Sequence, residues 1–429
     1  MENLLVNKVA AVKEVRQAAE YQKKKQACIL TGLAGSSKPV FFAAADKLLG
    51  GKGSMAFITA SREEIRTYRR ELNYLYPDLP MQELYPVSLP RVQADTQSLE
   101  LQAGRAAALR FLSGEERGIV FITAEALQQK QLRPSGMSGK ALQLAVGEEH
   151  EQRNIAAALL DLGYERTEQV DALGQFCLRG DILDVYPINS SAAVRIEWFD
   201  NELDAMRSFD VDTQRSLQTL SSIKIAPLKV DESFSYDADI FEYCAADTMV
   251  VVDEPVHVFG MLEKLDKENK EHASELFNKQ ELIEQLAANG AMLVSALGHS
   301  YLQQLPSLNI PVRAVAPYNK NTNLLVEDLQ NWLAEGITPL IMLSGSIKAR
   351  GFADNLRNYG LKGHFAQKSF EPGVVNVTYG DLDHGFRFWD EEWLLLTEND
   401  IFGMQKRKRL HTKNQGQQLQ YFSDIKAGD

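Results

Sequence analysis

Residues 32–39 have the spacing of a phosphate-binding loop. The stretch reads Gly-Leu-Ala-Gly-Ser-Ser-Lys-Pro, whereas a working loop reads GxxxxGK[ST]. In a working loop the glycines let backbone N–H groups surround phosphates, the lysine reaches the terminal phosphates, and the hydroxyl group binds Mg²⁺. Gly32 and Lys38 occupy the first glycine and the lysine positions. The chemistry that this spacing would serve is nucleotide binding.

Two substitutions argue against a functional nucleotide site. Ser37 stands where the second glycine belongs, and a left-handed backbone there would cost about 1–2 kcal/mol. Pro39 replaces the hydroxyl group and removes a backbone N–H, although its fixed φ suits the first turn of a helix. We therefore expect a degenerate loop that keeps its fold but has lost its nucleotide. Gly32, Gly35 and Lys38 remain able to hold a phosphate or sulfate without Mg²⁺.

The flanking sequence favours a degenerate loop over a chance match. Residues 27–31 read as a short buried strand and residues 40–49 as a helix, which is the required order around such a loop. An ordinary strand-to-helix turn that happens to contain a lysine is the alternative. Residues 248–252 form an apolar run that ends in Asp253 and Glu254, as in ATPases whose acidic pair binds Mg²⁺. Many buried strands end in an acidic turn, so this vestigial acidic pair is weak support on its own.

Composition restricts the class of protein. The chain has 429 residues, enough for two to four domains, and 45% apolar with 24% charged residues is typical of a soluble globular protein. The net charge of −12 argues against a broad nucleic-acid-binding face, so DNA binding would need a local basic patch. The one dense basic run is Lys406–Arg409, which we interpret as a solvated linker.

Cysteine spacing and hydropathy favour a cytoplasmic protein without a metal site. The three cysteines lie far apart in apolar sequence, which is typical of reduced core thiols. The sequence has no apolar signal segment and no run of about 18 apolar residues that would cross a membrane. We therefore expect no membrane partner, and no residue pattern indicates a catalytic triad.

Helix and strand patterns divide the chain into an interrupted α/β domain and a second, smaller one. Residues 1–137 alternate helix and strand patterns, which predicts a doubly wound α/β domain, and residues 61–64 match a helix capping box. Residues 138–226 read as a small α+β insert, with strand-like segments at 176–186, 194–199 and 205–210. The α/β pattern returns at 227–316. A third small α/β domain is expected at 317–411, followed by a linker at 412–429.

Three stretches of the insert resemble a known repair module. They are Phe176–Pro187, Val194–Asp200 and Phe209–Ser216. They are similar to the UvrA-binding module shared by the bacterial transcription-repair coupling factors, the Mfd family, and the excision-repair helicase UvrB. The resemblance to the N-terminal part of the Mfd family extends over nearly the whole chain. It implies a degenerate RecA-like domain interrupted by the UvrA-binding insert, and the decay at Ser37 and Pro39 favours Mfd over UvrB.

The resemblance also implies that functions of the family lie outside this chain. Residues 396–403 resemble the end of the third region of the family, and residues 422–429 resemble the entry to its RNA-polymerase-binding domain. We therefore expect a fragment without a cofactor or catalytic residues of its own, because ATP and Mg²⁺ belong to a motor in the C-terminal half. RNA polymerase and DNA would be contacted through those absent domains. In the whole protein the UvrA-binding face would be masked by the C-terminal part.

Arg179, Arg195 and Phe199 are the candidate partner-binding residues. In an alternating strand, Arg195 and Phe199 share one face and Ile196 lies on the other. An exposed arginine beside an aromatic ring is typical of a protein interface. By resemblance, these three residues match those with which the module contacts UvrA. The alternative is that Phe199 belongs to the core and that both arginines pair with nearby acids such as Asp181, Glu197 or Asp200.

Two functions from different classes follow. The first is a non-catalytic adaptor that recruits UvrA to stalled RNA polymerase in nucleotide excision repair. The second is a UvrB-like, nucleotide-dependent helicase fragment that grips damaged DNA. UvrB threads DNA behind an aromatic-rich hairpin that follows its phosphate loop, yet between Tyr76 and Val92 the only aromatic residue is Tyr85. Because each base stacked on an aromatic ring contributes about 1–3 kcal/mol, this absence favours the adaptor.

Overall fold

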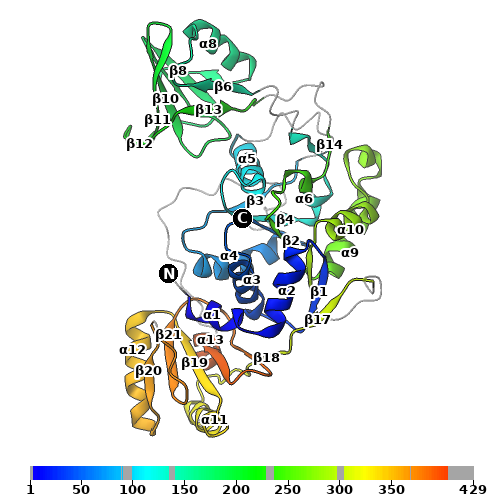
Figure 1. Cartoon of the computed structure of the whole chain (residues 1–429), viewed down its shortest axis with the longest axis vertical. Coiled ribbons are helices and arrows are strands. Elements are labelled where there is room, and N and C mark those ends of the chain that lie inside the picture. The colour runs from blue at the N-terminus through cyan, green and yellow to red at the C-terminus, as the bar shows by residue number, and fades with distance from the viewer. Residues whose placement is uncertain are drawn as a thin grey trace, which may run out of the picture.

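A computed structural model describes residues 3–87, 89, 99–134, 141–228, 236–296, 304–367 and 369–403. These residues form three bodies, each built on its own main sheet. In Figure 1 the central body lies between the insert, at the top, and the third body, at the bottom. The expected linker at 412–429 and the basic run at 406–409 lie outside the described residues.

The central body contains a seven-stranded parallel sheet with helices on both faces (Figure 1). In spatial order its strands are β17 (Ser307–Asn309), β1 (Cys28–Thr31), β16 (Met292–Ser295), β15 (Met249–Asp253), β2 (Met55–Thr59), β4 (Ile119–Thr123) and β3 (Met81–Leu84). One face packs against α1 (Leu4–Ala10), α2 (Lys13–Lys23), α3 (Ser37–Leu48) and α4 (Arg62–Leu75). The other packs against α5 (Leu99–Ser113), α6 (Ala124–Gln128), α9 (Pro255–Glu268) and α10 (Lys279–Ala288).

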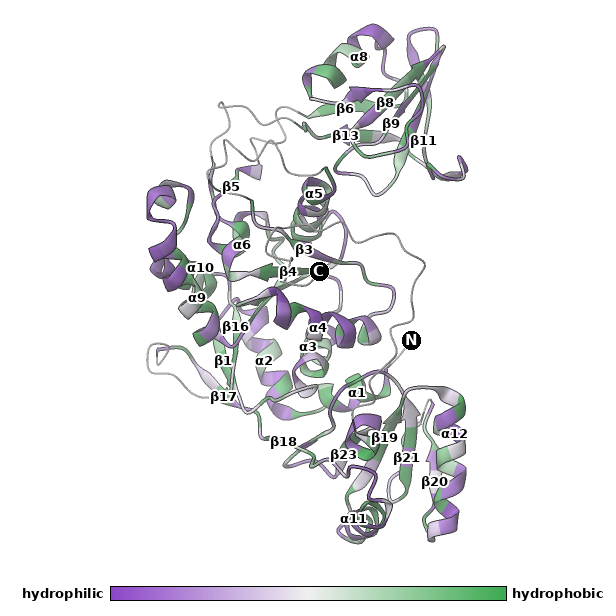
Figure 2. Cartoon of the chain, turned by 180° about the vertical axis from the view of Figure 1, so that it is seen from behind, coloured by the Kyte–Doolittle hydropathy of each residue, from purple (hydrophilic) through white to green (hydrophobic). Residues whose placement is uncertain are grey.

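The sequence produces this sandwich because its strands are apolar on both faces. In β2, Phe57 joins the core under α3 and α4, whereas Ile58 joins the core under α6 and α9. Continuous apolar strands of this kind are typical of parallel sheets that are covered on both sides. Figure 2 shows the contrast with surface helices such as α4 and α12 (Ser346–Asn355), which carry hydrophilic residues along their length. The expected doubly wound arrangement is thus present, and the capping box at 61–64 is confirmed.

The insert is a mixed sheet with one covering helix. Its strands follow the order β12 (Ser216–Thr219), β11 (Glu202–Phe209), β10 (Ala193–Phe199), β9 (Ile182–Val185), β8 (Gln175–Arg179) and β7 (Glu165–Arg166). A two-stranded ribbon of β6 (Leu142–Ala145) and β13 (Ser222–Ile225) shares a core with this sheet and α8 (Gln152–Asp161). The continuous strand expected at 176–186 is wrong. A turn at Gly180, where φ is +55°, divides it into the hairpin β8–β9.

The third body contains a six-stranded mixed sheet. Its order is β18 (Val312–Ala314), β22 (Phe386–Phe388), β23 (Trp393–Thr397), β19 (Thr338–Leu343), β21 (Val375–Tyr379) and β20 (Gly363–Phe365). Helix α11 (Thr322–Ala334), helix α12 and the 3₁₀ turn Leu356–Tyr359 pack with it, and α13 (Glu398–Phe402) follows β23. The chain leaves the central sheet after Asn309 and enters the third at Val312.

Short elements complete the described structure. A small ribbon pairs β5 (Gln131–Leu132) with β14 (Tyr236–Ala238), and 3₁₀ turns lie at Ile240–Tyr243 and Lys270–Glu275. Within the described ranges, no helix is long and apolar enough to cross a membrane.

Candidate functional site

The degenerate loop connects β1 to α3, at the position where a nucleotide-binding loop would lie. Gly32 has φ of +87°, and a Cβ there would lie 2.3 Å from the carbonyl oxygen of Ile310, so this glycine fits where a side chain would not. The left-handed backbone that would strain Ser37 is absent, because α3 begins at that residue with a right-handed backbone. The helix therefore begins three residues earlier than expected, and Pro39 lies in its first turn.

Several backbone N–H groups and the Ser37 hydroxyl of this loop make hydrogen bonds within the loop itself. The backbone N–H of Ala34 donates to Ser37 Oγ over 3.0 Å, and Ser37 Oγ donates to the carbonyl oxygen of Ala34 over 2.7 Å. The backbone N–H of Lys38 donates to the carbonyl oxygen of Gly35 over 3.1 Å. In a working loop such N–H groups face phosphates. Here at least two of them are already used within the loop.

Lys38 is paired with the vestigial acidic pair. Its Nζ lies 2.7 Å from Asp253 Oδ1 and 2.8 Å from Glu254 Oε1, and its side chain is only 10% exposed. Tyr68, on α4, donates to Asp253 Oδ2 over 2.7 Å, and Glu254 accepts the backbone N–H of Ala296 over 3.1 Å. In a nucleotide-hydrolysing enzyme, phosphate and Mg²⁺ lie between this lysine and the acids. Here the ammonium group contacts both carboxylates directly, so that space is closed.

The electrostatics of this cluster favour the charged forms of lysine and glutamate. Burial opposes the charge of Lys38, but Asp253 and Glu254 outweigh it and raise the pKa of the lysine. Burial likewise opposes the charge of Glu254, yet its hydrogen bond to Lys38 leaves the pKa of the carboxyl group lowered. Burial and the neighbouring Asp253 raise the pKa of Tyr68, so the tyrosine stays a donor. Across the described ranges, no group of three or more His, Cys, Asp or Glu residues is arranged to hold a metal ion.

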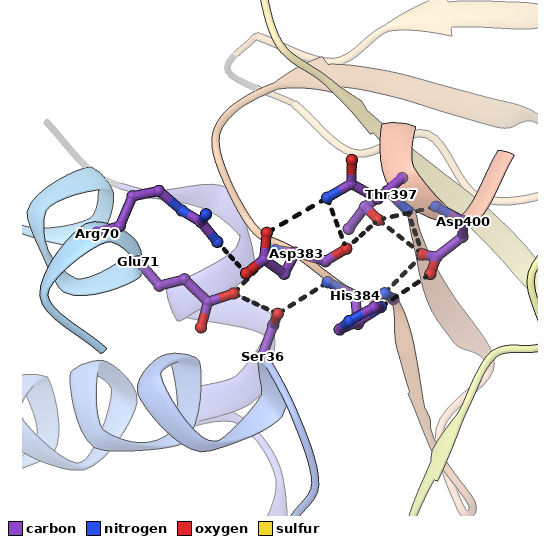
Figure 3. Close-up of polar contacts among 9 residues, drawn as sticks. Ser36, Arg70, Glu71, Asp383, His384, Thr397 and Asp400 are labelled. Carbon is purple, nitrogen blue, oxygen red and sulfur yellow. Dashed lines mark hydrogen bonds and ion pairs between the residues drawn. The ribbon is translucent and has the colours of Figure 1, made fainter. Parts of the chain in front are cut away.

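The same loop also docks the third body (Figure 3). Ser36 Oγ donates to Glu71 on α4 and accepts the backbone N–H of His384 over 2.9 Å. Glu71 also accepts the backbone N–H of Asp383 over 2.8 Å, and Arg70 pairs with the carboxylate of Asp383. Ser36 and Glu71 are both buried. The loop therefore serves as a contact between two bodies, which nothing in its sequence had indicated.

In the insert, the three candidate partner-binding residues share one face of the sheet, with Arg179 and Phe199 towards one end and Arg195 within β10. Arg179 precedes the β8–β9 turn, and Phe199 ends β10 beside that turn, because the backbone N–H of Trp198 donates to Asp181 over 2.9 Å. Phe199 is 78% exposed, whereas Trp198 and Ile196 are buried. The predicted alternation in β10 is confirmed. The register between β10 and β11 shifts after Glu197, because β11 contains an extra residue, Asp204, in a β-bulge.

The two arginines differ in freedom. Arg195 makes a two-pronged pair with the carboxylate of Asp184, at 2.6 and 2.7 Å, and a 3.1 Å hydrogen bond to Gln214. This hydrogen-bonded pair raises the pKa of Arg195 and fixes the plane of its guanidinium group. Arg179 is exposed and donates to the backbone carbonyl of Glu168. The alternative interpretation is thus half right, because Arg195 has an acid partner, although not Asp181, while Phe199 lies outside the core.

Ile182 is a residue of this face that sequence reasoning missed. It begins β9, is 37% exposed, and lies directly opposite both Arg179 on β8 and Glu197 on β10. We define Arg179, Ile182, Arg195 and Phe199 as the hairpin-end face. It combines an exposed ring, an aliphatic side chain and two guanidinium groups, which suits a partner with acidic groups around an apolar patch. The alternation of β9 would have indicated Ile182 had the turn at Gly180 been recognised.

Lys38→Met should lower the free energy of unfolding by about 3–5 kcal/mol, because it leaves two partly buried carboxylates without their cation. Urea unfolding monitored by circular dichroism measures this loss. The matched control is Lys52→Met at an exposed lysine, which should change stability by less than about 0.5 kcal/mol. Equal stability of both variants would refute a structural role for the Lys38 pair.

Glu254→Gln should destabilise the chain at neutral pH and much less in acid. The pKa of Glu254 is lowered in the folded state, so its contribution is present above the unfolded value near 4.5 and is lost as pH falls through the folded value. The gap in urea midpoint between parent and variant should therefore be constant from pH 7 to about 5 and shrink below about pH 4. A pH-independent gap contradicts this assignment. Glu63→Gln, at an exposed acid on α4, serves as the control.

Comparison with known proteins identifies the family resemblance independently of this geometry. A family model described as the UvrB interaction domain matches residues 142–230, which include the hairpin-end face. The transcription-repair-coupling factor of Bacillus subtilis is 23% identical over 94% of this chain and 40% of its own length. The Staphylococcus epidermidis protein of the same name is 22% identical over 94% of this chain, and the Escherichia coli protein is 28% identical over 38% of it.

The relatives that match 94% of this chain are much longer than it is, and the chain spans about 40% of their length. The resemblance stated from the sequence is thereby confirmed. The chain is homologous to the N-terminal part of the transcription-repair-coupling factors and contains a UvrB interaction domain.

Proposed function

We propose that this chain is a non-catalytic adaptor that binds UvrA in nucleotide excision repair. The observation that carries the proposal is the hairpin-end face, where Phe199 is 78% exposed on the same face as Arg179 within the matched domain. An aromatic ring left in water has no role in the fold, and burial against a partner would stabilise a complex by about 1.5–3 kcal/mol. The match to the UvrB interaction domain and the exposed side chains thus support the same surface.

The roles of the candidate residues follow from their contacts. Phe199 and Ile182 would fill an apolar recess of UvrA, and Arg179 would pair with a carboxylate at its rim. Arg195 is held by Asp184 and stays 21% exposed at its side chain, which leaves it able to present one edge of a fixed guanidinium group. Because its conformation is already set, little entropy would be lost on binding.

The domain organisation proposed is an interrupted nucleotide-hydrolase-like domain followed by a smaller one. Strands before and after the insert share the central sheet, which supports one domain formed by residues 1–137 and 227–316 around the insert at 138–226. The last domain is proposed for residues 317–411. A RecA-like origin of the central domain is supported by the position of the degenerate loop between β1 and α3 and of the acidic pair after β15.

We assign no ATP hydrolysis to this chain. Lys38 and the acidic pair neutralise one another, so phosphate and Mg²⁺ would have to displace a partly buried ion pair. In the parent protein we place an ATP-dependent DNA translocase, together with contacts to RNA polymerase and DNA, in domains beyond this chain. Masking of the hairpin-end face by those domains is part of the same proposal.

The alternative, a UvrB-like helicase fragment, is disfavoured by the same ion pair. A helicase fragment that depends on nucleotide needs Lys38 available for phosphates, whereas this lysine has two carboxylate partners within 2.8 Å. Phosphate or sulfate binding at Gly32, Gly35 and Lys38 remains a prediction, and the pairing of Lys38 makes weak binding the expected outcome.

The adaptor proposal predicts saturable binding of purified UvrA to the full 429-residue chain. Phe199→Ala should weaken this binding by about 2 kcal/mol or more, and Arg179→Ala and Ile182→Ala by smaller amounts, because central aromatic anchors dominate interface energies. Isothermal titration calorimetry measures the affinities, and circular dichroism verifies that each variant is folded.

Two controls sharpen this titration. Ile347→Ala removes a 90% exposed aliphatic side chain from the third body and should leave the affinity unchanged. Asp184→Asn removes the charge partner of Arg195 but keeps the arginine. If it weakens UvrA binding as much as Arg195→Ala does, then Arg195 contributes to binding by stabilising the insert and not by contacting UvrA. Equal binding by parent and Phe199→Ala would reject the proposed surface.

The chain should also lack ATPase activity. Any residual phosphate release should be the same in parent and Lys38→Ala preparations, because it would come from a contaminant. A phosphate-release assay with Mg·ATP measures this. Turnover that is present in the parent and abolished by Lys38→Ala would overturn the non-catalytic assignment.

A further inference from the structure

Two arginines and a tryptophan gather on one face at the edge of the third sheet. Arg313 on β18 lies directly opposite Arg387 on β22, and Trp389 follows β22 on the same side as Arg387. The guanidinium carbon of Arg313 lies 3.8 Å from the centre of the Trp389 ring, and that of Arg387 lies 6.0 Å away. We call these three residues the Arg–Trp cluster. No part of the proposed UvrA-binding function uses it.

The two positive charges of the cluster have no counterion in the part of the chain that the structure describes. Among the described residues, neither guanidinium group has a hydrogen-bond or ion-pair partner, and Arg387 Nε is buried without one. Like charges directly opposite one another on neighbouring strands are destabilising, whereas the contact with Trp389 is favourable to both cations. A bound anion would relieve the repulsion. Two neighbouring arginines without an acid partner in the described structure are unusual in a chain with a net charge of −12.

Part of the Trp389 ring remains accessible beside the Arg313 guanidinium group, which lies over the ring. Trp389 is 50% exposed, whereas Phe386 and Phe388 point to the opposite side and are buried in the core shared with the central body. No other large exposed apolar side chain belongs to β18 or β22 in the described structure. A protein hot spot would be surrounded by apolar groups that exclude water. A single exposed ring beside two cations instead suits a polymer of planar bases and phosphates.

We propose that the Arg–Trp cluster binds single-stranded nucleic acid, with one base stacked against Trp389 and adjacent phosphates paired with Arg313 and Arg387. Strand β18 forms the outer edge of its sheet within the described ranges, so an extended strand meets no other described strand there. Arginine contributes to such binding both by charge and by stacking on bases. This inference is independent of the UvrA-binding proposal.

Nearby acids limit the strength of the site. Asp390 is exposed directly after Trp389, and Glu391 follows it and accepts a hydrogen bond from Trp393. With two phosphate contacts and one stacked base, binding should be weak and strongly dependent on salt. Each neutralised phosphate of a single strand contributes a slope of about −0.7 in log affinity against log salt, so a slope near −1.4 is expected.

The test is a titration of fluorescein-labelled dT12 with the full chain at low salt, measured by fluorescence anisotropy. Trp389→Ala should weaken binding by roughly tenfold or more, and Trp389→Phe by much less, because a smaller ring still stacks. Arg313→Ala and Arg387→Ala should each weaken binding and reduce the salt slope by about 0.7. Asp390→Asn should strengthen binding, a direction that loss of folding cannot produce.

The matched control is Arg350→Ala. Arg350 is exposed on α12 of the same body and also lies beside an aromatic ring, Phe365, at 5.0 Å. It should leave the affinity unchanged. Absence of saturable binding to dT12, or binding that all three cluster variants leave unaltered, would overturn the proposal. Binding of a labelled oligoglutamate peptide in place of dT12, with the same dependence on the three residues, would overturn it in favour of an acidic protein partner.

Discussion

The central body depends on a buried ion pair that joins two distant parts of the chain. Lys38 and Asp253 are separated by 215 residues, with the whole insert between them, yet their charged atoms lie 2.7 Å apart. The pair joins the start of α3 to the carboxyl end of β15, and Tyr68 and Ala296 attach α4 and the end of β16 to the same carboxylates. An ATPase leaves this space for a ligand. In this chain the side chains fill it, so the two segments of the central sheet are held without a nucleotide.

Closure of this site is consistent with a transfer of function to other surfaces. Ser36, two residues before Lys38, accepts a hydrogen bond from His384 of the third body, so the former phosphate loop serves as a docking contact. The insert is thus attached to a central body whose former nucleotide site is filled by its own side chains. The insert, which carries the hairpin-end face, lies at the opposite end of the molecule from the third body (Figure 1). The proposed adaptor would gain from such a closed central body, because a surface that need not reorganise loses less entropy on binding.

Local patterns in the sequence predicted local features well. Apolar runs located the central strands, Gly32 and Lys38 located the degenerate loop, and the alternation of β10 placed Phe199 on an exposed face. Contacts between distant segments were not predictable. The pairing of Lys38 with Asp253 depends on parallel strand order, and the pairing of Arg195 with Asp184 depends on the register set by the turn at Gly180. Ser36 and His384 are 348 residues apart, and no pattern in either segment refers to the other. The clustering of Arg313, Arg387 and Trp389 likewise arises only when two separate strands pair.

Hydrogen–deuterium exchange of the full chain with and without UvrA tests the central claim most directly, because it examines the hairpin-end face and the closed loop in one measurement. The account predicts protection by UvrA confined to residues 176–184 and 194–202, with exchange at residues 32–40 unchanged. Protection at the loop with none at the hairpin-end face would contradict it, because the old nucleotide site would then be the working surface.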